Sequence, residues 1–318
     1  MHEFDLIKKY FSKLTDNKSS LDLNDDVFFD KKKELVISVD TYNEGIHFLD
    51  FKEPGLVIKK IIRSSISDLI CKGVDPKFYF ISASGNKKSF TKTNLSKISN
   101  SLKQEQEKYN ILLCGGDTTF SNKLSFSITS VGFSKKIIFR NNAKINDDIY
   151  VTGNLGDSYI GLQVLRNKIK VNKNICDYFI NKYYEPNIQI KLSKKLLNFA
   201  NTSIDVSDGL VADLEKMINN QKLSYKLHID KIPISKQLSN LIKTKKLNKS
   251  KLISNGDDYQ VLFTASPGKS RIIHKVSKII GAKITKIGKI SSSSKKSYII
   301  DPKGKQILLK NKGYLHQF

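Results

Sequence analysis

The sequence has few of the residues that build disulfide frameworks and zinc sites. Its 318 residues include no tryptophan, six prolines and only three cysteines, Cys71, Cys114 and Cys176. Their odd number, their wide separation and the lack of a C-x-x-C pair argue against disulfides and against a zinc site. The five histidines are scattered along the sequence, so they do not supply a zinc-ligand pattern either.

Long hydrophobic runs are also missing. No apolar stretch approaches the roughly 18 residues that a membrane-spanning helix needs, so we expect no membrane association. Residues 1–7 carry an acid early and lack a basic region followed by a long apolar stretch, so they do not resemble a signal peptide. The expected location is the cytoplasm.

Acidic residues are outnumbered by basic ones. The sequence has 30 Asp and Glu against 55 Lys and Arg, a formal net charge of +25. Such an excess can mark a nucleic-acid-binding protein. The lysines are spread over the whole length, however, and no basic block is interleaved with aromatic residues. We therefore expect no nucleic-acid partner and keep a basic nucleic-acid-binding protein as the less favoured alternative.

The first part of the sequence alternates between helical and extended patterns. A helix is predicted after Pro54, because Val57, Ile58 and Ile61 fall near helical spacing, and Gly73 ends it. Strands are predicted at residues 35–39, 78–83, 111–113 and 124–133, with a polar helix at 94–109.

A domain boundary is predicted where residues 135–148 mix basic residues with Asn-Asn and Asn-Asp-Asp. The division gives an N-terminal domain of residues 1–139 and a C-terminal domain of residues 140–318. Helices are then predicted at 159–167, 188–199, 210–219 and 272–280. Strands are predicted at 149–152, 203–206, 225–229, 261–264, 284–290 and 298–300, with a loop at 291–294. Both halves are expected to be α/β, with helices and strands in layers.

Several aspartates stand at the ends of apolar runs, where a short anionic side chain emerges at the rim of a sheet. They are Asp40, Asp117, Asp205 and Asp208, together with the Asp25-Asp26 pair in a polar turn. Each one alone could be only a helix cap or turn former. If they converge, their mutual repulsion requires cations, and Mg²⁺, which bridges carboxylates to substrate phosphates, fits best.

Two glycine-containing segments, 115–119 and 153–157, are predicted as turns whose backbone N–H groups could approach phosphate. Neither is a Walker A loop, because G-x-x-x-x-G-K-[ST] does not occur.

Taken in order, the motifs resemble those of thiamine-monophosphate kinases over essentially the full length. The motifs of the first half are Asn24-Asp25-Asp26, Ile37-Ser38-Val39-Asp40-Thr41, Glu44-Gly45-Ile46-His47-Phe48, Ser67-Asp68-Leu69 and Gly115-Gly116-Asp117-Thr118-Thr119. Those of the second half are Gly156-Asp157-Ser158, residues 204–210, Gly256-Asp257-Asp258-Tyr259 and residues 312–318.

The resemblance implies an architecture and a set of site residues. It places the chain in the aminoimidazole-ribonucleotide-synthetase-like superfamily, whose members pair two α/β domains, dimerise through the N-terminal sheets and bind ATP between subunits. The implied magnesium ligands are Asp26, Ser38, the backbone of Val39, Asp40, Asp68, Asp117, Asp205 and Asp208. The implied ATP contacts are Gly116, Asp117, Arg140 and Ser207, and the implied substrate contacts are His47, Asp257 and Tyr314. Asp117, Asp208 and Arg140 would be catalytic.

Some positions depart from the family pattern. Asn24 and Asn255 stand where Gly is usual, Asp257 where Glu is usual and Ser65 where Asn is usual. Asn tolerates positive φ better than most residues, so both turns are expected to keep their shape. Asp257 has a shorter reach than Glu toward the substrate.

The implied reaction transfers the γ-phosphoryl group of ATP to the phosphate of thiamine monophosphate. Because that acceptor is already an anion, the enzyme needs no general base and can align two polyanions with Mg²⁺ for direct in-line transfer. His47 would position the acceptor phosphate, and Tyr314 would stack on the cationic thiamine rings. Another ATP-dependent enzyme of the superfamily, similar to aminoimidazole ribonucleotide synthetase, remains the enzymatic alternative.

Overall fold

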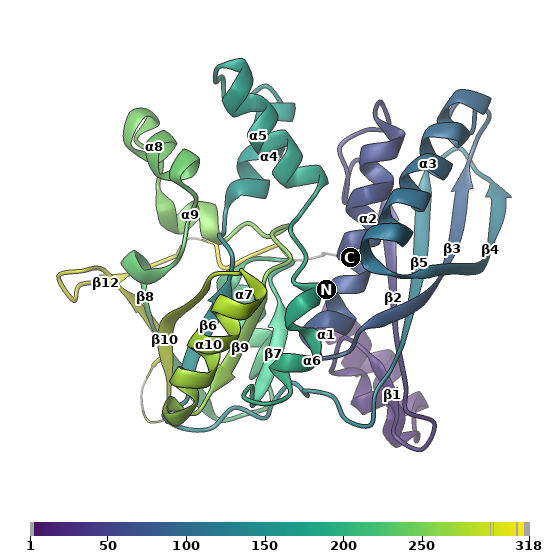
Figure 1. The fold of residues 1–318 in the computed structure, drawn as a ribbon. Helices are drawn as coiled ribbons and strands as arrows, with labels where there is room; N and C mark the ends of the chain where they lie inside the picture. The colour runs from purple at the N-terminus through teal and green to yellow at the C-terminus, as the bar shows by residue number, and fades with distance from the viewer. Residues whose placement is uncertain (1–2, 293, 295, 310, 315–318) are drawn as a thin grey trace.

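The computed structural model describes residues 3–292, 294, 296–309 and 311–314 and contains two β-sheets with helices beside them (Figure 1). The mixed α/β class predicted from the sequence is confirmed. The first sheet uses strands from residues 28–133 and the second uses strands from residues 148–307. The predicted division after residue 139 falls between the two sheets and remains a prediction.

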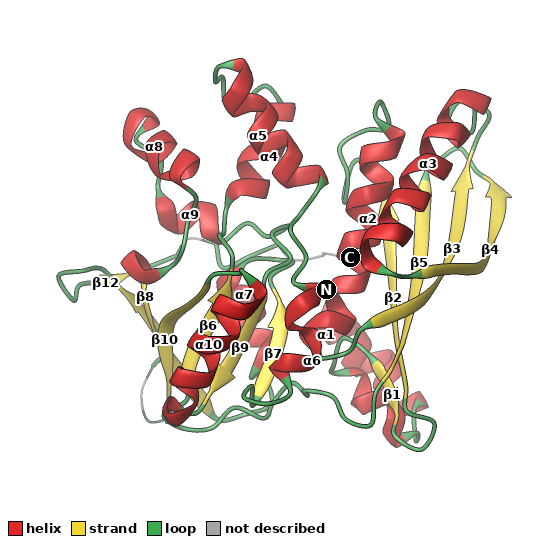
Figure 2. Cartoon of the chain, viewed as in Figure 1, coloured by secondary structure: helices red, strands yellow, loops and turns green. Residues whose placement is uncertain are grey.

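The first sheet has five strands in the order β1-β2-β5-β3-β4. They are β1 (Phe28–Asp30), β2 (Leu35–Asn43), β3 (Pro76–Gly85), β4 (Leu112–Phe120) and β5 (Ser125–Phe133). Only β3 and β4 pair in parallel. Helices α2 (Pro54–Cys71) and α3 (Lys92–Tyr109) lie on one side of this sheet (Figure 2).

The second sheet has seven strands in the order β12-β11-β8-β10-β6-β9-β7. They are β6 (Asp148–Thr152), β7 (Thr202–Asp205), β8 (Leu223–His228), β9 (Val261–Ala265), β10 (Ile284–Ser292), β11 (Tyr298–Ile300) and β12 (Gln306–Ile307). The central strands β6 and β9 are buried along their whole length, as expected for a sheet covered on both faces.

The second half of the chain also contains short and medium helices. They are α4 (Asp157–Leu165), α5 (Lys173–Tyr184), α6 (Ser193–Leu196), α7 (Leu210–Met217), α8 (Lys236–Lys245), α9 (Lys249–Ile253) and α10 (Ser270–Ile280). The N-terminal segment forms α1 (Glu3–Leu6), a π-helical turn (Ile7–Phe11) and 3-10 turns (Ser12–Leu14, Lys18–Leu23). Further 3-10 turns are Ile190–Leu192, Ile229–Lys231 and Pro267–Lys269. None of the described helices is long and apolar enough to cross a membrane.

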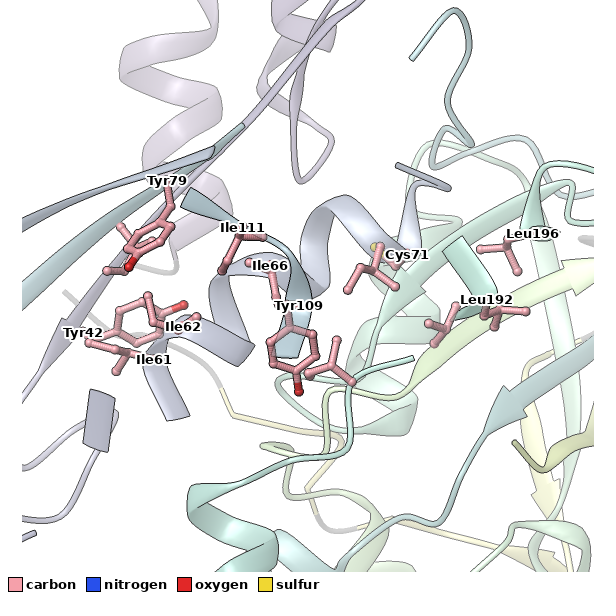
Figure 3. Packing of buried hydrophobic residues seen from close by; sticks show 14 of the residues in the cluster. Tyr42, Ile61, Ile62, Ile66, Cys71, Tyr79, Tyr109, Ile111, Leu192 and Leu196 are labelled. Carbon is pink, nitrogen blue, oxygen red and sulfur yellow. The ribbon is translucent and has the colours of Figure 1, made fainter. Parts of the chain in front are cut away.

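Helix α2 joins the two halves. It is buried on nearly all sides, and its isoleucines belong to one core with Tyr42 and Tyr79 of the first sheet and with Leu192 and Leu196 of the second half (Figure 3). Its buried residues include charged and polar side chains as well as apolar ones. Each buried polar side chain on α2 needs a hydrogen-bond or ion-pair partner inside the protein.

Three sequence predictions were wrong. The helix predicted at 188–199 is interrupted, with only a 3-10 turn and the four residues of α6. The turn predicted at 115–119 is part of β4, in which a Cβ on Gly116 would lie 1.8 Å from the carbonyl oxygen of Ile81. The loop predicted at 291–294 begins inside β10, while residue 293 lies outside the described residues.

Candidate active site

A cavity of 320 Å³ opens between the two halves of the chain. The first half contributes the end of β2, the following loop and α2. The second half contributes α4, the loop after β7 and residues 255–259. The lining includes the predicted site residues Asp40, His47, Asp68, Asp205, Ser207, Asp208, Asp257 and Tyr314.

Three of these carboxylates come from three different elements: Asp40 from β2, Asp68 from α2 and Asp205 from the end of β7. Burial is the largest cause that raises the pKa of each one. Repulsion from Asp205 adds to this at Asp40, whose pKa rises to about 7, and repulsion from both other carboxylates adds to it at Asp68. The fold therefore concentrates negative charge that a cation would relieve.

Hydroxyl groups hold these carboxylates in place. Ser38 donates a hydrogen bond to Oδ2 of Asp68 at 2.5 Å, and Tyr42 donates to Asp40 at 3.1 Å. Ser67 donates to Asp205. Carboxylate and hydroxyl oxygens are the donors that Mg²⁺ prefers, so the residue types fit a magnesium site. Within the described ranges no three His, Cys, Asp or Glu side chains are already arranged to hold a metal, so a bound ion would have to draw these oxygens closer.

Asp26, another predicted ligand, lies in a neighbouring charge cluster. Lys72 is completely buried and places Nζ 2.6 Å from Asp25 and 2.7 Å from Asp26. Arg140 pairs with Asp26 as well, with Nε at 3.1 Å from Oδ2, and its backbone N–H donates to Asp25. Burial is the largest single influence and would lower the pKa of Lys72, but the combined interactions with Asp25, Cys71 and Asp68 raise it. Arg140 is therefore next to a predicted metal ligand.

Asp208 lies in the loop between β7 and α7. Lys216 pairs with it, and Asp213 accepts the backbone N–H groups of Asp208 and Gly209, both at 2.9 Å. Burial, partly offset by Lys216, raises the pKa of Asp213 to about 7. Asp213 thus fixes the loop that carries Asp208.

The predicted substrate contacts line the same cavity. Nδ1 of His47 accepts the backbone N–H of Asn43 at 2.9 Å, so a neutral ring carries its proton on Nε2. The Asp257 carboxylate pairs with Lys60 at 2.8 Å. Tyr314 is half exposed, and its backbone N–H bonds to the carbonyl of Asp208, which places the C-terminal segment beside the metal-ligand candidates. The rest of the predicted C-terminal motif, residues 315–318, lies outside the described residues.

Three predicted residues lie away from the cavity. Val39 is 65% exposed and alternates in β2 with Ser38 and Asp40. Gly116 and Asp117 lie on β4, where every side chain is exposed. Strand register places Asp117 beside Ser82, Ser127 and Thr41, on the face of the sheet opposite to Asp40. Within one chain Asp117 does not join the other carboxylates, and its ligand role remains a prediction.

Neither Asn24 nor Asn255 takes a positive φ, so the expected left-handed conformation is not needed at these two positions. Positive φ occurs instead at neighbouring residues, namely Leu21, Asp22 and Leu23 before Asn24 and Asp257 after Asn255. Ser65 hydrogen-bonds Ser130 across α2 and β5 at 2.8 Å.

Four important charged residues were missed from the sequence: Lys60, Lys72, Asp213 and Lys216. Lys60 lies inside α2 and Lys72 directly follows its last residue, and a lysine is usually solvent-exposed. No local pattern in the sequence indicates that these two lysines are buried.

The chain is similar in sequence and in structure to known proteins. Residues 23–134 match the family described as AIR synthase related protein, N-terminal domain. The chain is 35% identical over 326 residues to the thiamine-monophosphate kinase of Buchnera aphidicola subsp. Acyrthosiphon pisum, covering 99% of this chain and 98% of that relative. It is 30% identical over 322 residues to the thiamine-monophosphate kinase of Escherichia coli strain K12, with the same coverage. The solved structure of AaThiL complexed with AMPPCP and TMP aligns with a TM-score of 0.86 at 26% identity, covering 99% of this chain and 97% of that one. The chain therefore belongs to the thiamine-monophosphate kinase family.

Proposed function

We propose that this chain transfers the γ-phosphoryl group of ATP directly to the phosphate of thiamine monophosphate, giving thiamine diphosphate and ADP. The observation that carries the proposal is the convergence of Asp40, Asp68 and Asp205 from three elements on one cavity, in a chain with full-length family relatives. The structure of AaThiL with AMPPCP and TMP, a solved relative, supports the choice of the two substrates.

We assign the magnesium ligands to the carboxylates of this cavity and its neighbourhood, namely Asp26, Asp40, Asp68, Asp205 and Asp208, with Ser38 and the backbone of Val39. Bound Mg²⁺ would neutralise the negative charge of the phosphate groups that meet there. The protein's own part is to hold the carboxylates through Ser38, Ser67 and Tyr42 and to keep the two polyanions in line.

The acceptor would lie between His47, Asp257 and Tyr314. Nε2–H of His47 can donate to the acceptor phosphate, because Nδ1 is already used as an acceptor. The carboxylate of Asp257 and the half-exposed ring of Tyr314 are suited to a cationic, aromatic substrate. Ser207 and Arg140 are assigned to the ATP side.

A homodimer formed through the first sheet is part of the proposal. On the face of this sheet away from α2 and α3, no helix in the described part of the chain covers the strands, and large apolar side chains are exposed (Figure 2). They include Val39, Phe80 and Leu112. Such a patch favours a protein–protein interface. Gly116 and Asp117 lie at this surface and would contribute to nucleotide and metal binding across it. The cytoplasm, where ATP is available, remains the proposed location.

The experiment that tests the substrate is an acceptor panel. Purified protein is given ATP, Mg²⁺ and either thiamine monophosphate, free thiamine or an aminoimidazole ribonucleotide precursor, and ADP release is measured. Turnover with thiamine monophosphate alone supports the proposal. Turnover only with another acceptor keeps the fold assignment and refutes the proposed substrate.

A further inference from the structure

Lys60 is a buried lysine that reaches across the two halves of the chain. It lies on α2, its side chain is 1% exposed, and its Nζ lies 2.8 Å from Oδ1 of Asp257. The ammonium group also lies 4.0 Å from the ring centroid of Tyr183 and 5.6 Å from that of Tyr259. Burying an ammonium group is costly, and an ion pair does not by itself return that cost. The arrangement therefore calls for a function beyond stability.

The backbone of Asp257 is fixed independently of Lys60. Its N–H donates to the carbonyl oxygen of Ser207 at 2.8 Å. At the preceding Gly256 a Cβ would lie 1.6 Å from that same oxygen, so the two segments are in direct contact. Asp257 itself takes φ +66°, a conformation that Asp tolerates better than most residues. Its backbone is thus anchored to the loop that carries Asp208, and only the side-chain orientation remains to be set.

The two oxygens of Asp257 have different surroundings. Oδ1 accepts from Lys60 at 2.8 Å and from the hydroxyl of Tyr259 at 3.1 Å. Among the described residues no group donates to Oδ2. The side chain is 28% exposed and lines the 320 Å³ cavity, so the free acceptor oxygen is accessible to a bound molecule.

We propose that Lys60 is a positioning residue for the acceptor substrate. It binds Oδ1 of Asp257 and so presents Oδ2 to the cavity, where this oxygen accepts a hydrogen bond from an amino group of the substrate's aromatic ring. Tyr259 shares this task, and the Tyr183 ring shields the ammonium group from water. The inference rests on the proposed function, because it identifies what binds the organic part of a phosphate-ester acceptor.

The test compares Lys60→Met with Lys59→Met. Lys59 is the preceding residue on α2 and pairs with Glu185 at 3.3 Å, and it does not line the cavity. Steady-state kinetics are measured while thiamine monophosphate and ATP are varied in turn. A contact made equally in the ground and transition states changes KM and leaves kcat alone. For Lys60→Met we expect KM for thiamine monophosphate to rise about tenfold, as for a lost hydrogen bond to a charged group. The kcat and the KM for ATP should be unchanged, and Lys59→Met should behave like the unmodified chain.

A second variant separates positioning from a structural role. Lys60→Met combined with Asp257→Asn removes both charges and leaves no buried ion without its partner. If Lys60 acts only through Asp257, the double variant has the same KM as Asp257→Asn alone. Unchanged KM in Lys60→Met, or losses that affect both substrates and add up in the double variant, would overturn the inference while thiamine monophosphate turnover persists. Absence of that turnover in the unmodified chain would instead refute the proposed function, and this inference with it.

Discussion

At the residue scale, the site is defined by carboxylates that the protein buries without enough positive charge. Lys72 and Arg140 compensate Asp25 and Asp26, and Lys216 compensates Asp208. Asp40, Asp68 and Asp205 receive mainly hydroxyl hydrogen bonds. Carboxylates with a Lys or Arg partner are therefore already charge-compensated, whereas the three with mainly hydroxyl partners are candidates for binding a cation.

Asp205 is the most direct residue to change. Asp205→Asn removes one negative charge and keeps the shape of the side chain. We expect turnover to fall by about 10²-fold or more, the scale for losing a group that stabilises transition-state charge. The fold should persist, as measured by circular dichroism and thermal unfolding. Asp177→Asn, at an exposed position of α5, is the matched control and should retain full activity. A near-normal rate for Asp205→Asn would remove this carboxylate from the metal site.

The raised pKa values also predict how stability depends on pH. A carboxylate whose pKa is higher in the folded chain than in the unfolded chain stabilises the fold at low pH, and this contribution is lost as the pH rises through the folded value. For Asp40 that value is about 7. Metal-free protein should therefore have a higher unfolding temperature at pH 6 than at pH 8. Added Mg²⁺ should raise the unfolding temperature more at pH 8, since it binds the ionised carboxylates. Equal Mg²⁺ stabilisation at both pH values would contradict this account.

At the element scale, α2 carries much of the structure and much of the site. It contributes Asp68 to the carboxylates and Lys60 to Asp257. It also contributes Arg63, whose guanidinium makes two 2.8 Å hydrogen bonds to Glu105 of α3 and one to Glu185 after α5. Arg63 and Glu105 are both almost completely buried. Ion pairs as well as apolar packing thus hold α2 against the neighbouring elements.

Breaking this buried pair should be more harmful than removing it. Arg63→Met leaves the Glu105 carboxylate buried and uncompensated, which is expected to cost about 3–5 kcal/mol. Arg63→Met combined with Glu105→Met replaces both charges by apolar side chains and should recover most of that loss. Urea denaturation of the single and double variants measures both values. A double variant as unstable as the single one would show that burial of the charge is not the cause.

The sequence predicted α2 and most strands because their apolar spacing is regular, but it failed where local pattern and tertiary context differ. Residues 188–199 have helical composition, yet the chain must turn there to reach β7, and only α6 forms. Helix α8 was missed because polar residues dominate it. Helix α5 was also missed, although more than half of its residues are apolar or aromatic. The structure places Asp40, Asp68 and Asp205 at one cavity and Asp117 on the opposite face of the first sheet, and the role of each as a ligand stays a prediction. No local pattern indicates on which face of a sheet an edge strand places its side chains.

At the scale of the whole molecule, Asp117 lies on the face of the first sheet that α2 and α3 leave uncovered. Within one chain it lies on β4, three strands from Asp40 and on the opposite face. If Asp117 is a ligand, as the family pattern implies, it can act only where two sheets meet. Catalysis should then depend on the proposed homodimer.

Mixing two inactive variants tests this dependence. Asp117→Asn and Asp205→Asn are expected to be inactive when each is assayed alone. If Asp117 serves the partner's site, exchange of subunits between the two variants gives mixed dimers in which one site has all its carboxylates. Activity should then return to a substantial fraction of the unmodified rate. No recovery, despite subunit exchange confirmed by light scattering and mass spectrometry, would contradict supply across the interface.

The dependence of phosphoryl transfer on a carboxylate-held magnesium site is tested by measuring product formation with and without a divalent cation. Protein stripped with a chelator is incubated with ATP and thiamine monophosphate, before and after Mg²⁺ is restored, and thiamine diphosphate and ADP are quantified by chromatography. We expect equal amounts of both products with Mg²⁺ and essentially none without it. ADP without thiamine diphosphate, or undiminished formation of thiamine diphosphate in the presence of chelator, would contradict a carboxylate-held magnesium site that serves a thiamine-monophosphate kinase.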